Sequence, residues 1–295
     1  MLAFFILIGI TGLGRGSSFL FIYLGIEQMH PVSVITFRLI FAGIIAVLYL
    51  IYTRELGNLV SRRYVLAGGV LSLFGLLIPF YLIAYAELSV ETSIAGVLTA
   101  GVPLITSLIL TVIFKEKQKS LLGMLIGLFG VWLIYAGAGV ERVPTYNMHL
   151  LFVVLSLLCY ATHNIIVSRI TEINKRSLAC VSMVYAALYS VIVHFLVTPW
   201  NTTLNAHNLV VTATLGVFCT AVPLIALFIA IDRFGSVKGS YGAYIIPIVA
   251  IMLGFLVLGE TVTLIQLLGA FLILGSIYVQ AIKEQLGSGR IKHQN

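Results

Sequence analysis

The stretch Pro79–Glu116 reads PFYLIAYAELSVETSIAGVLTAGVPLITSLILTVIFKE, and Pro223–Glu260 reads PLIALFIAIDRFGSVKGSYGAYIIPIVAIMLGFLVLGE. Each begins with a proline, has a second proline 24 residues later (Pro103 and Pro247) and ends with a glutamate, so the two stretches are in register 144 residues apart. The chain has only seven prolines, and four fall in these matched pairs. Five hydrophobic segments fit between equivalent points. An odd number of spans reverses the second copy, which predicts an inverted-topology repeat, a construction that many secondary transporters share.

The composition places the chain in a membrane. Of its 295 residues, 60% are hydrophobic and 9% are charged, and the mean hydropathy is +1.12. A soluble domain has about 25% charged residues, so no large soluble domain fits in this sequence. The net charge of +7 can indicate nucleic acid, but the basic residues stand at the ends of hydrophobic runs, without interleaved aromatic residues. The expected partner is a lipid bilayer and no nucleic acid.

Ten segments are long enough to cross a bilayer, which takes about 20 apolar residues in a helix. Lipid offers backbone amides no hydrogen-bond partners, so each segment is expected to be helical. The predicted helices occupy 3–25, 32–53, 65–86, 93–114, 119–138, 148–168, 178–198, 209–231, 238–258 and 263–282. The predicted fold is an all-α integral membrane protein with ten transmembrane helices in two inverted five-helix repeats, at 1–140 and 146–285, followed by a cytoplasmic tail at 286–295.

The distribution of lysine and arginine predicts the orientation. With ten spans and the N-terminus inside the cell, 14 of the 17 basic residues fall in inner loops or the tail, and only Arg142 falls in an outer loop. The other two, Arg15 and Arg38, lie within spans. We therefore expect a multi-pass protein of the cell membrane with both termini in the cytoplasm.

Several kinds of chemistry have no support in the sequence. There is no Walker motif for ATP, no HExxH or other clustered metal-ligand set, and no Ser-His-Asp arrangement. The cysteines Cys159, Cys180 and Cys219 form no CxxC pair and are expected to be small packing residues. We predict no cofactor, no metal and no enzymatic activity.

Short motifs recur in order along the chain. They are Pro31 followed by Arg38, Ala84–Leu88, Ser93–Leu98, Pro103-Leu104, Phe114–Lys117, Pro247-Ile248, Gly259–Thr261, Gln266, Gly269 and Leu272-Ile273. Together they resemble the EamA-type transporters of the drug/metabolite transporter superfamily. The resemblance implies ten helices in two inverted halves around a central cavity, and export or exchange of small metabolites such as amino acids. Where that family usually has Trp-Gly in its first helix, this chain has Gly14-Arg15-Gly16.

Arg15 lies at the middle of the first predicted helix, near the bilayer midplane. A charge there costs about 2.5–3.5 kcal/mol on insertion scales, and the flanking glycines allow a helix or a ligand to approach closely. We predict that Arg15 faces the cavity and holds a substrate carboxylate or phosphate. The alternative is a structural cation paired with carbonyls or a carboxylate at a helix end.

Seven further residues are predicted to line the substrate site. Pro103 and Pro247 each free a backbone carbonyl near mid-membrane, with Thr99 and Tyr244 beside them on the same helices. Aromatic walls with a few polar tips suit a small organic ligand, and the side chains of this kind are Tyr81, Tyr160 and Asn164. The alternative is that the prolines only shape packing and that the tyrosines mark the membrane interface.

Other polar residues are expected to have structural roles. Arg38 lies nearer the outer face, where its long side chain can reach the headgroups or Glu27. Glu87 and Glu91 flank the outer end of the third helix and are expected to be solvated. His163 can relay protons in principle, but a hydrogen-bonded packing role is expected.

The main hypothesis is a secondary carrier of small metabolites such as amino acids or related organic anions, acting as an exporter or exchanger by alternating access. Its energy would come from the substrate gradient, from exchange or from the proton-motive force, so proton coupling is one option. The first alternative is a membrane-embedded enzyme acting on lipid-linked substrates, which needs acidic or histidine clusters at an interface. The second is a passive channel, which would show no exchange kinetics.

Overall fold

The computed structural model describes residues 2–115, 125–127, 129–130, 132–133, 144–197, 205–234, 242–243, 245–273 and 275–276, and these ranges contain no strand. The helices are α1 (Leu2–Ile26), α2 (Pro31–Tyr52), η1 (Leu56–Leu59), α3 (Arg62–Ser72), η2 (Leu73–Leu77), α4 (Ile78–Ala86), α5 (Thr92–Thr99), α6 (Val102–Val112), α8 (Pro144–Arg169), α9 (Lys175–Val197), α10 (Ala206–Gly216), η3 (Val217–Ala221), α11 (Val222–Phe234), α13 (Ile246–Leu258) and an apolar helix at Leu264–Ile273. Within the described residues, six helical stretches are long and apolar enough to cross a membrane. Most of the predicted helix 119–138 lies outside the described residues.

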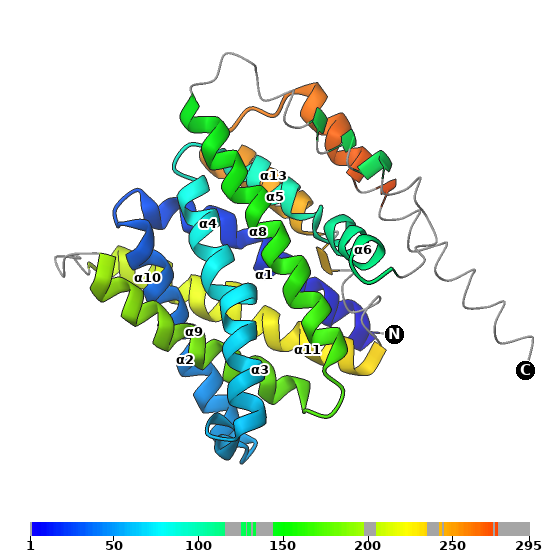
Figure 1. The fold of residues 1–295 in the computed structure, drawn as a ribbon. Coiled ribbons are helices and arrows are strands. Elements are labelled where there is room, and N and C mark those ends of the chain that lie inside the picture. Colours follow the sequence, from blue (N-terminus) through cyan, green and yellow to red (C-terminus); the bar gives the residue numbers. More distant parts are fainter. Residues whose placement is uncertain are drawn as a thin grey trace, which may run out of the picture.

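The internal repeat is visible in where the helices begin. The first residues of α2 and α9, of α3 and α10, and of α6 and α13 are each 144 residues apart. The two halves interlock rather than lie side by side (Figure 1). Contacts between the halves come in matched pairs. Helix α1 packs on α11, and their counterparts α8 and α4 pack on each other. Likewise α3 packs on α9, and their counterparts α10 and α2 pack on each other. The predicted all-helical fold with two repeats is therefore confirmed.

Two wide helical turns also repeat. The π-helical turn η2 ends just before Ile78-Pro79, and η3 ends just before Val222-Pro223, 144 residues later. Proline has no N–H to donate, and its ring clashes with the carbonyl four residues earlier, so a helix that continues through it has to widen or bend. The matched prolines therefore place the same distortion at the same point of each half.

The predicted single helix 93–114 is wrong in one respect, because the structure divides it into α5 and α6. The chain turns tightly at Ala100 and Gly101, whose N–H groups donate to the carbonyls of Val97 and Leu98 three residues earlier. Pro103, at the second position of α6, cannot donate to Thr99 and so ends the first helix. Discontinuous helices of this kind frame the binding sites of many transporters.

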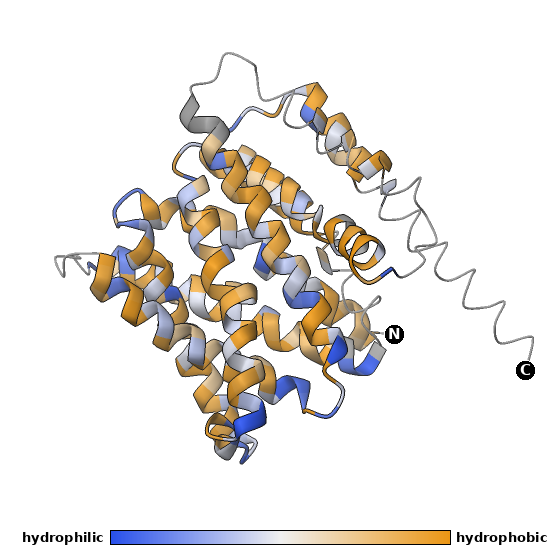
Figure 2. Cartoon of the chain, viewed as in Figure 1, coloured by the Kyte–Doolittle hydropathy of each residue, from blue (hydrophilic) through white to orange (hydrophobic). Residues whose placement is uncertain are grey.

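The outer faces of the helices are apolar, as Figure 2 shows by colour. On α2 and α9 the large exposed side chains include Leu48, Ile51, Leu188, Ile192 and Phe195. Exposed hydrophobic faces this extensive are rare in a soluble monomer and are typical of surfaces that contact lipid. The polar residues considered next lie between the helices instead.

Candidate substrate-binding site

Arg38 is buried between the two halves and corrects the sequence prediction of a side chain that reaches the headgroups. It is 2% exposed. Its Nε donates a hydrogen bond of 2.8 Å to Thr220 Oγ1 in the second half, and its guanidinium lies 3.7 Å from the ring centroid of Phe80. Its Nη1 is buried without a hydrogen-bond partner among the described residues. Because a buried charge is costly until it is paired, this nitrogen is a candidate contact for an anionic ligand.

The position of Thr220 follows from the π-helical turn η3. Its hydroxyl donates to the Leu215 carbonyl five residues earlier at 2.8 Å, a bond that spans the wide turn. The same oxygen accepts from Arg38, so one hydroxyl both closes the turn and contacts the cation. Opposite it, a Cβ atom on Gly216 would come within 2.5 Å of the Arg38 carbonyl oxygen. Glycine at that position therefore lets α10 approach α2 closely enough for the contact to form.

Arg15 lies beside Tyr160 of α8. The guanidinium carbon is 5.5 Å from the centre of the tyrosine ring, within cation–π range. Arg15 is half-buried and Tyr160 is buried. Tyr160 interacts electrostatically with both Arg15 and Arg38, and the two arginines repel each other. Arg15 therefore contacts Tyr160, and Arg38 lies within electrostatic range of both, an arrangement called here the two-arginine site.

The glycines around Arg15 are in close contact with the other half. A Cβ on Gly14 would lie 2.4 Å from Pro223 Cγ, and a Cβ on Gly16 would lie 2.7 Å from Val249 Cβ. Both positions exclude any larger residue unless the helices separate. Helices α11 and α13 therefore pack directly against α1 at these two glycines, and this packing holds Arg15 in position.

The other predicted site residues are dispersed. The Tyr81 hydroxyl is 3.4 Å from Thr36 Oγ1, and the Thr99 hydroxyl donates to the Gly96 carbonyl of its own helix at 2.7 Å. Asn164 is exposed, although it lies only one helical turn after the buried Tyr160 on α8. Pro247 is buried at the second position of α13. Tyr244 and the side chain of Pro103 lie outside the described residues. The structure brings together Arg15 and Tyr160 of the predicted set, and adds Arg38 and Thr220.

His163 has the packing position that was expected. Its ring fills the space beside Gly75 in η2, where a Cβ would lie 2.2 Å from the imidazole carbon Cδ2. Its Nδ1 is 3.4 Å from Asn164 Oδ1. The imidazole therefore packs α8 against the wide turn of the first half.

Glu87 is a second correction, because it was expected to be solvated and is 3% exposed. It continues the last turn of α4, with its N–H donating to the Ile83 carbonyl, and this helical geometry turns the side chain inward. Neither carboxyl oxygen has a hydrogen-bond partner within the described part of the chain. Burial raises the pKa of Glu87 well above its usual range.

The two halves are joined near this end by a cap on α5. Glu260, which follows α13, accepts hydrogen bonds from the Thr92 N–H at 2.6 Å and the Ser93 N–H at 2.9 Å. A carboxylate at a helix N-terminus satisfies free N–H groups and is favoured by the positive end of the helix dipole. We call this contact the Glu260 cap.

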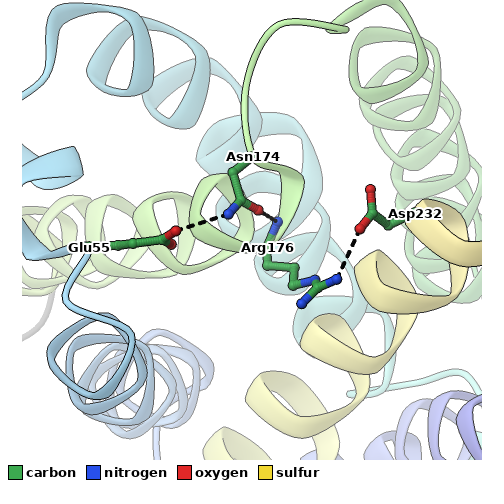
Figure 3. A network of polar contacts seen from close by, with 4 residues as sticks. All are labelled: Glu55, Asn174, Arg176 and Asp232. Carbon is green, nitrogen blue, oxygen red and sulfur yellow. Dashed lines mark hydrogen bonds and ion pairs between the residues drawn. The ribbon is translucent and has the colours of Figure 1, made fainter.

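The opposite end is joined by a polar network (Figure 3). Asn174 donates to Glu55 at 3.0 Å, and Arg176 pairs with Asp232 at 3.0 Å. Glu55 also accepts from Ser177, at the start of α9. Exposed contacts of this kind contribute little stability individually. With the Glu260 cap, the contacts of Glu55 with Asn174 and Ser177 join the two halves at both ends of the bundle.

A helical membrane protein with inverted halves and a buried arginine between them has the architecture of a secondary transporter. The chain belongs to the EamA-like transporter family, which matches residues 3–136 and 147–281. Membership of the drug/metabolite transporter superfamily follows, as the sequence motifs indicated. The domain boundaries at 1–140, 146–285 and 286–295 stay predictions.

Two individual proteins are similar over nearly the whole chain. The uncharacterized transporter YdfC of Bacillus subtilis (strain 168) is 25% identical over 274 residues, which cover 90% of this chain and 87% of YdfC. A protein of known crystal structure matches with a TM-score of 0.64 and 16% identity, and the match covers 96% of this chain and 98% of that one. At 16% identity the likeness shows the fold alone.

Proposed function

We propose that this transporter is a secondary carrier of small metabolites with an anionic group, such as amino acids or related organic anions. The observation that carries the proposal is the two-arginine site, where Arg38 Nη1 is buried without a partner among the described residues. A guanidinium binds a carboxylate or phosphate through two parallel hydrogen bonds. In a site of low dielectric constant such a pair is much stronger than in water.

Transport would proceed by alternating access in the cell membrane, as export or exchange. One half would rock against the other, so that the Glu260 cap and the Glu55 network release in turn. The energy would come from the substrate gradient, from exchange or from the proton-motive force. The 14 basic residues in the predicted inner loops and tail support an orientation with both termini in the cytoplasm. We propose a carrier rather than an enzyme or a channel.

The test is counterflow in proteoliposomes loaded with a panel of amino acids and organic acids, against their neutral amides. We expect saturable, trans-stimulated uptake of the carboxylates and not of the amides. Exchange kinetics of this kind separate a carrier from a channel.

Variants at Arg15 test the site itself. Arg15→Lys keeps the charge and loses the second parallel hydrogen bond, and Arg15→Trp removes the charge. We expect both variants to bind the carboxylate substrate more weakly. Losing a hydrogen bond to a charged group costs about 1.5–3 kcal/mol, or roughly 10- to 150-fold in affinity. Arg63→Gln, at an exposed arginine paired with Glu172, is the matched control and should transport normally. If Arg15→Trp exchanges carboxylates as well as wild type, Arg15 is a structural cation.

A further inference from the structure

The turn between α4 and α5 buries a carboxyl group that the two-arginine site does not use. Both oxygens of Glu87 are buried and without hydrogen-bond partners in the described ranges. An ionised carboxylate in such a place loses its hydration without compensation, whereas a protonated one is tolerated. Glu87 also stands at the C-terminal end of α4, where the helix dipole disfavours negative charge. The surroundings therefore favour a bound proton.

Two charged groups from other elements act on Glu87. Glu260, in the segment after α13, repels its negative charge, and Arg38 on α2 attracts it. Tyr23 of α1 interacts with Glu260, and Tyr160 of α8 interacts with Arg38. Glu87 is therefore linked electrostatically to the Glu260 cap on one side and to the two-arginine site on the other.

We propose that Glu87 binds the coupling proton of the transport cycle and that this proton controls the Glu260 cap. When Glu87 is protonated, it is neutral, and Glu260 keeps its hydrogen bonds to α5. When Glu87 loses the proton to the outer solution, two negative charges face each other, and Glu260 is favoured to leave α5. Loss of the proton therefore opens the end of the molecule at which Glu260 joins the two halves.

The proton is also linked to the substrate, a step that rests on the proposed function. An anion bound at Arg38 cancels the attraction that Arg38 exerts on ionised Glu87. Protonation of Glu87 then becomes more favourable, and by thermodynamic reciprocity the protonated protein binds the anion more tightly. Anion and proton are therefore expected to bind together and to cross the membrane together.

The proton site can be tested without knowing the substrate. The full chain, with its three cysteines replaced by alanine, receives spin labels at Leu88→Cys and Thr261→Cys, two exposed positions beside Glu87 and Glu260. Electron paramagnetic resonance measures the distance between the labels in lipid nanodiscs from pH 5 to pH 9. We expect a short distance at low pH that gives way to a longer one as the pH rises. Glu87→Gln should lose this response and keep the short distance throughout.

Controls make each outcome decisive. Glu27→Gln, at an exposed carboxylate of the same end, should titrate like wild type. The proposal is wrong if Glu87→Gln keeps the pH response, or if the wild-type distance does not change with pH. If Glu87→Gln does not fold, infrared spectroscopy of wild type decides, because the proposal requires a protonated carboxyl band that disappears over the same pH range in which the distance changes. If the label distance changes with pH but no anion counterflow is found, the proposed function is wrong and the proton site stands. If anion counterflow is found but the label distance does not change with pH, only the proton site is wrong.

Discussion

The hydrogen bond between Arg38 and Thr220 is the most informative contact to remove, because it joins the two halves inside the bundle. Thr220→Val keeps the shape of the side chain and deletes its hydroxyl. The bond from Arg38 is charge-assisted and worth about 1.5–3 kcal/mol, and the bond to the Leu215 carbonyl is worth about 0.5–1.5 kcal/mol. We expect the free energy of unfolding to fall by about 2–4 kcal/mol, or roughly 30- to 1000-fold in the folding equilibrium.

The measurement is reversible unfolding in mixed micelles with an increasing fraction of denaturing detergent, followed by circular dichroism. Thr212→Val is the matched control, because the Thr212 hydroxyl is equally buried but donates within its own helix, to the carbonyls of Asn208 at 2.7 Å and Leu209 at 3.3 Å. That variant should lose no more than about 1.5 kcal/mol. A double mutant with Arg38→Met should show a coupling energy of at least about 1 kcal/mol. If Thr220→Val costs no more than Thr212→Val, Thr220 does not hold Arg38, and the reasoning about the two-arginine site fails.

Two further predictions concern orientation and pH. A cysteine introduced at Asn205 should react with an impermeant maleimide in intact cells, and one at Lys175 should react only after permeabilisation; the opposite pattern would show that the orientation is reversed. Burial raises the pKa of Glu87 above its unfolded-state value, so its contribution to stability is complete below the unfolded-state pKa and is lost as the pH rises through the folded-state pKa. The free energy of unfolding should therefore fall more between pH 5 and pH 9 for wild type than for Glu87→Gln, and an equal fall would mean that Glu87 does not titrate in this range.

The helices and their repeat could be predicted because they depend on local chemistry. Apolar length predicts a span, and a proline predicts a distortion wherever it stands. The structure places η2 and η3 directly before Pro79 and Pro223 for this reason. The break between α5 and α6 was not predicted, because Pro103 was expected to free one carbonyl within a continuous helix rather than to end it. The nearness of Gly101 to Pro103 is the local signal that would have indicated it.

The candidate site could be predicted only in part, because the burial of a charge depends on distant partners. Arg38 was expected at the headgroups, yet it is bonded to Thr220, 182 positions along the chain. Glu87 was expected in water, because it follows a predicted span. No local pattern indicates that Glu260, from the other half, caps the neighbouring helix. Arg15 was easier to identify, since a midplane arginine is unusual in any helix.

The two halves share their shape and not their charges. Proline pairs and the glutamates Glu116 and Glu260 recur at the 144-residue offset, whereas the positions equivalent to Arg15, Arg38 and Glu87 are Cys159, Ser182 and Ile231. Bends are needed in both halves if an inverted pair is to close around one centre. A second pair of arginines would instead bring four like charges into one site of low dielectric constant, where they repel strongly. One asymmetric set of charges is what a single anion site needs. Because Ile231 cannot titrate, the response to pH is expected at the end where Glu260 caps α5, and not at the end closed by the Glu55 network.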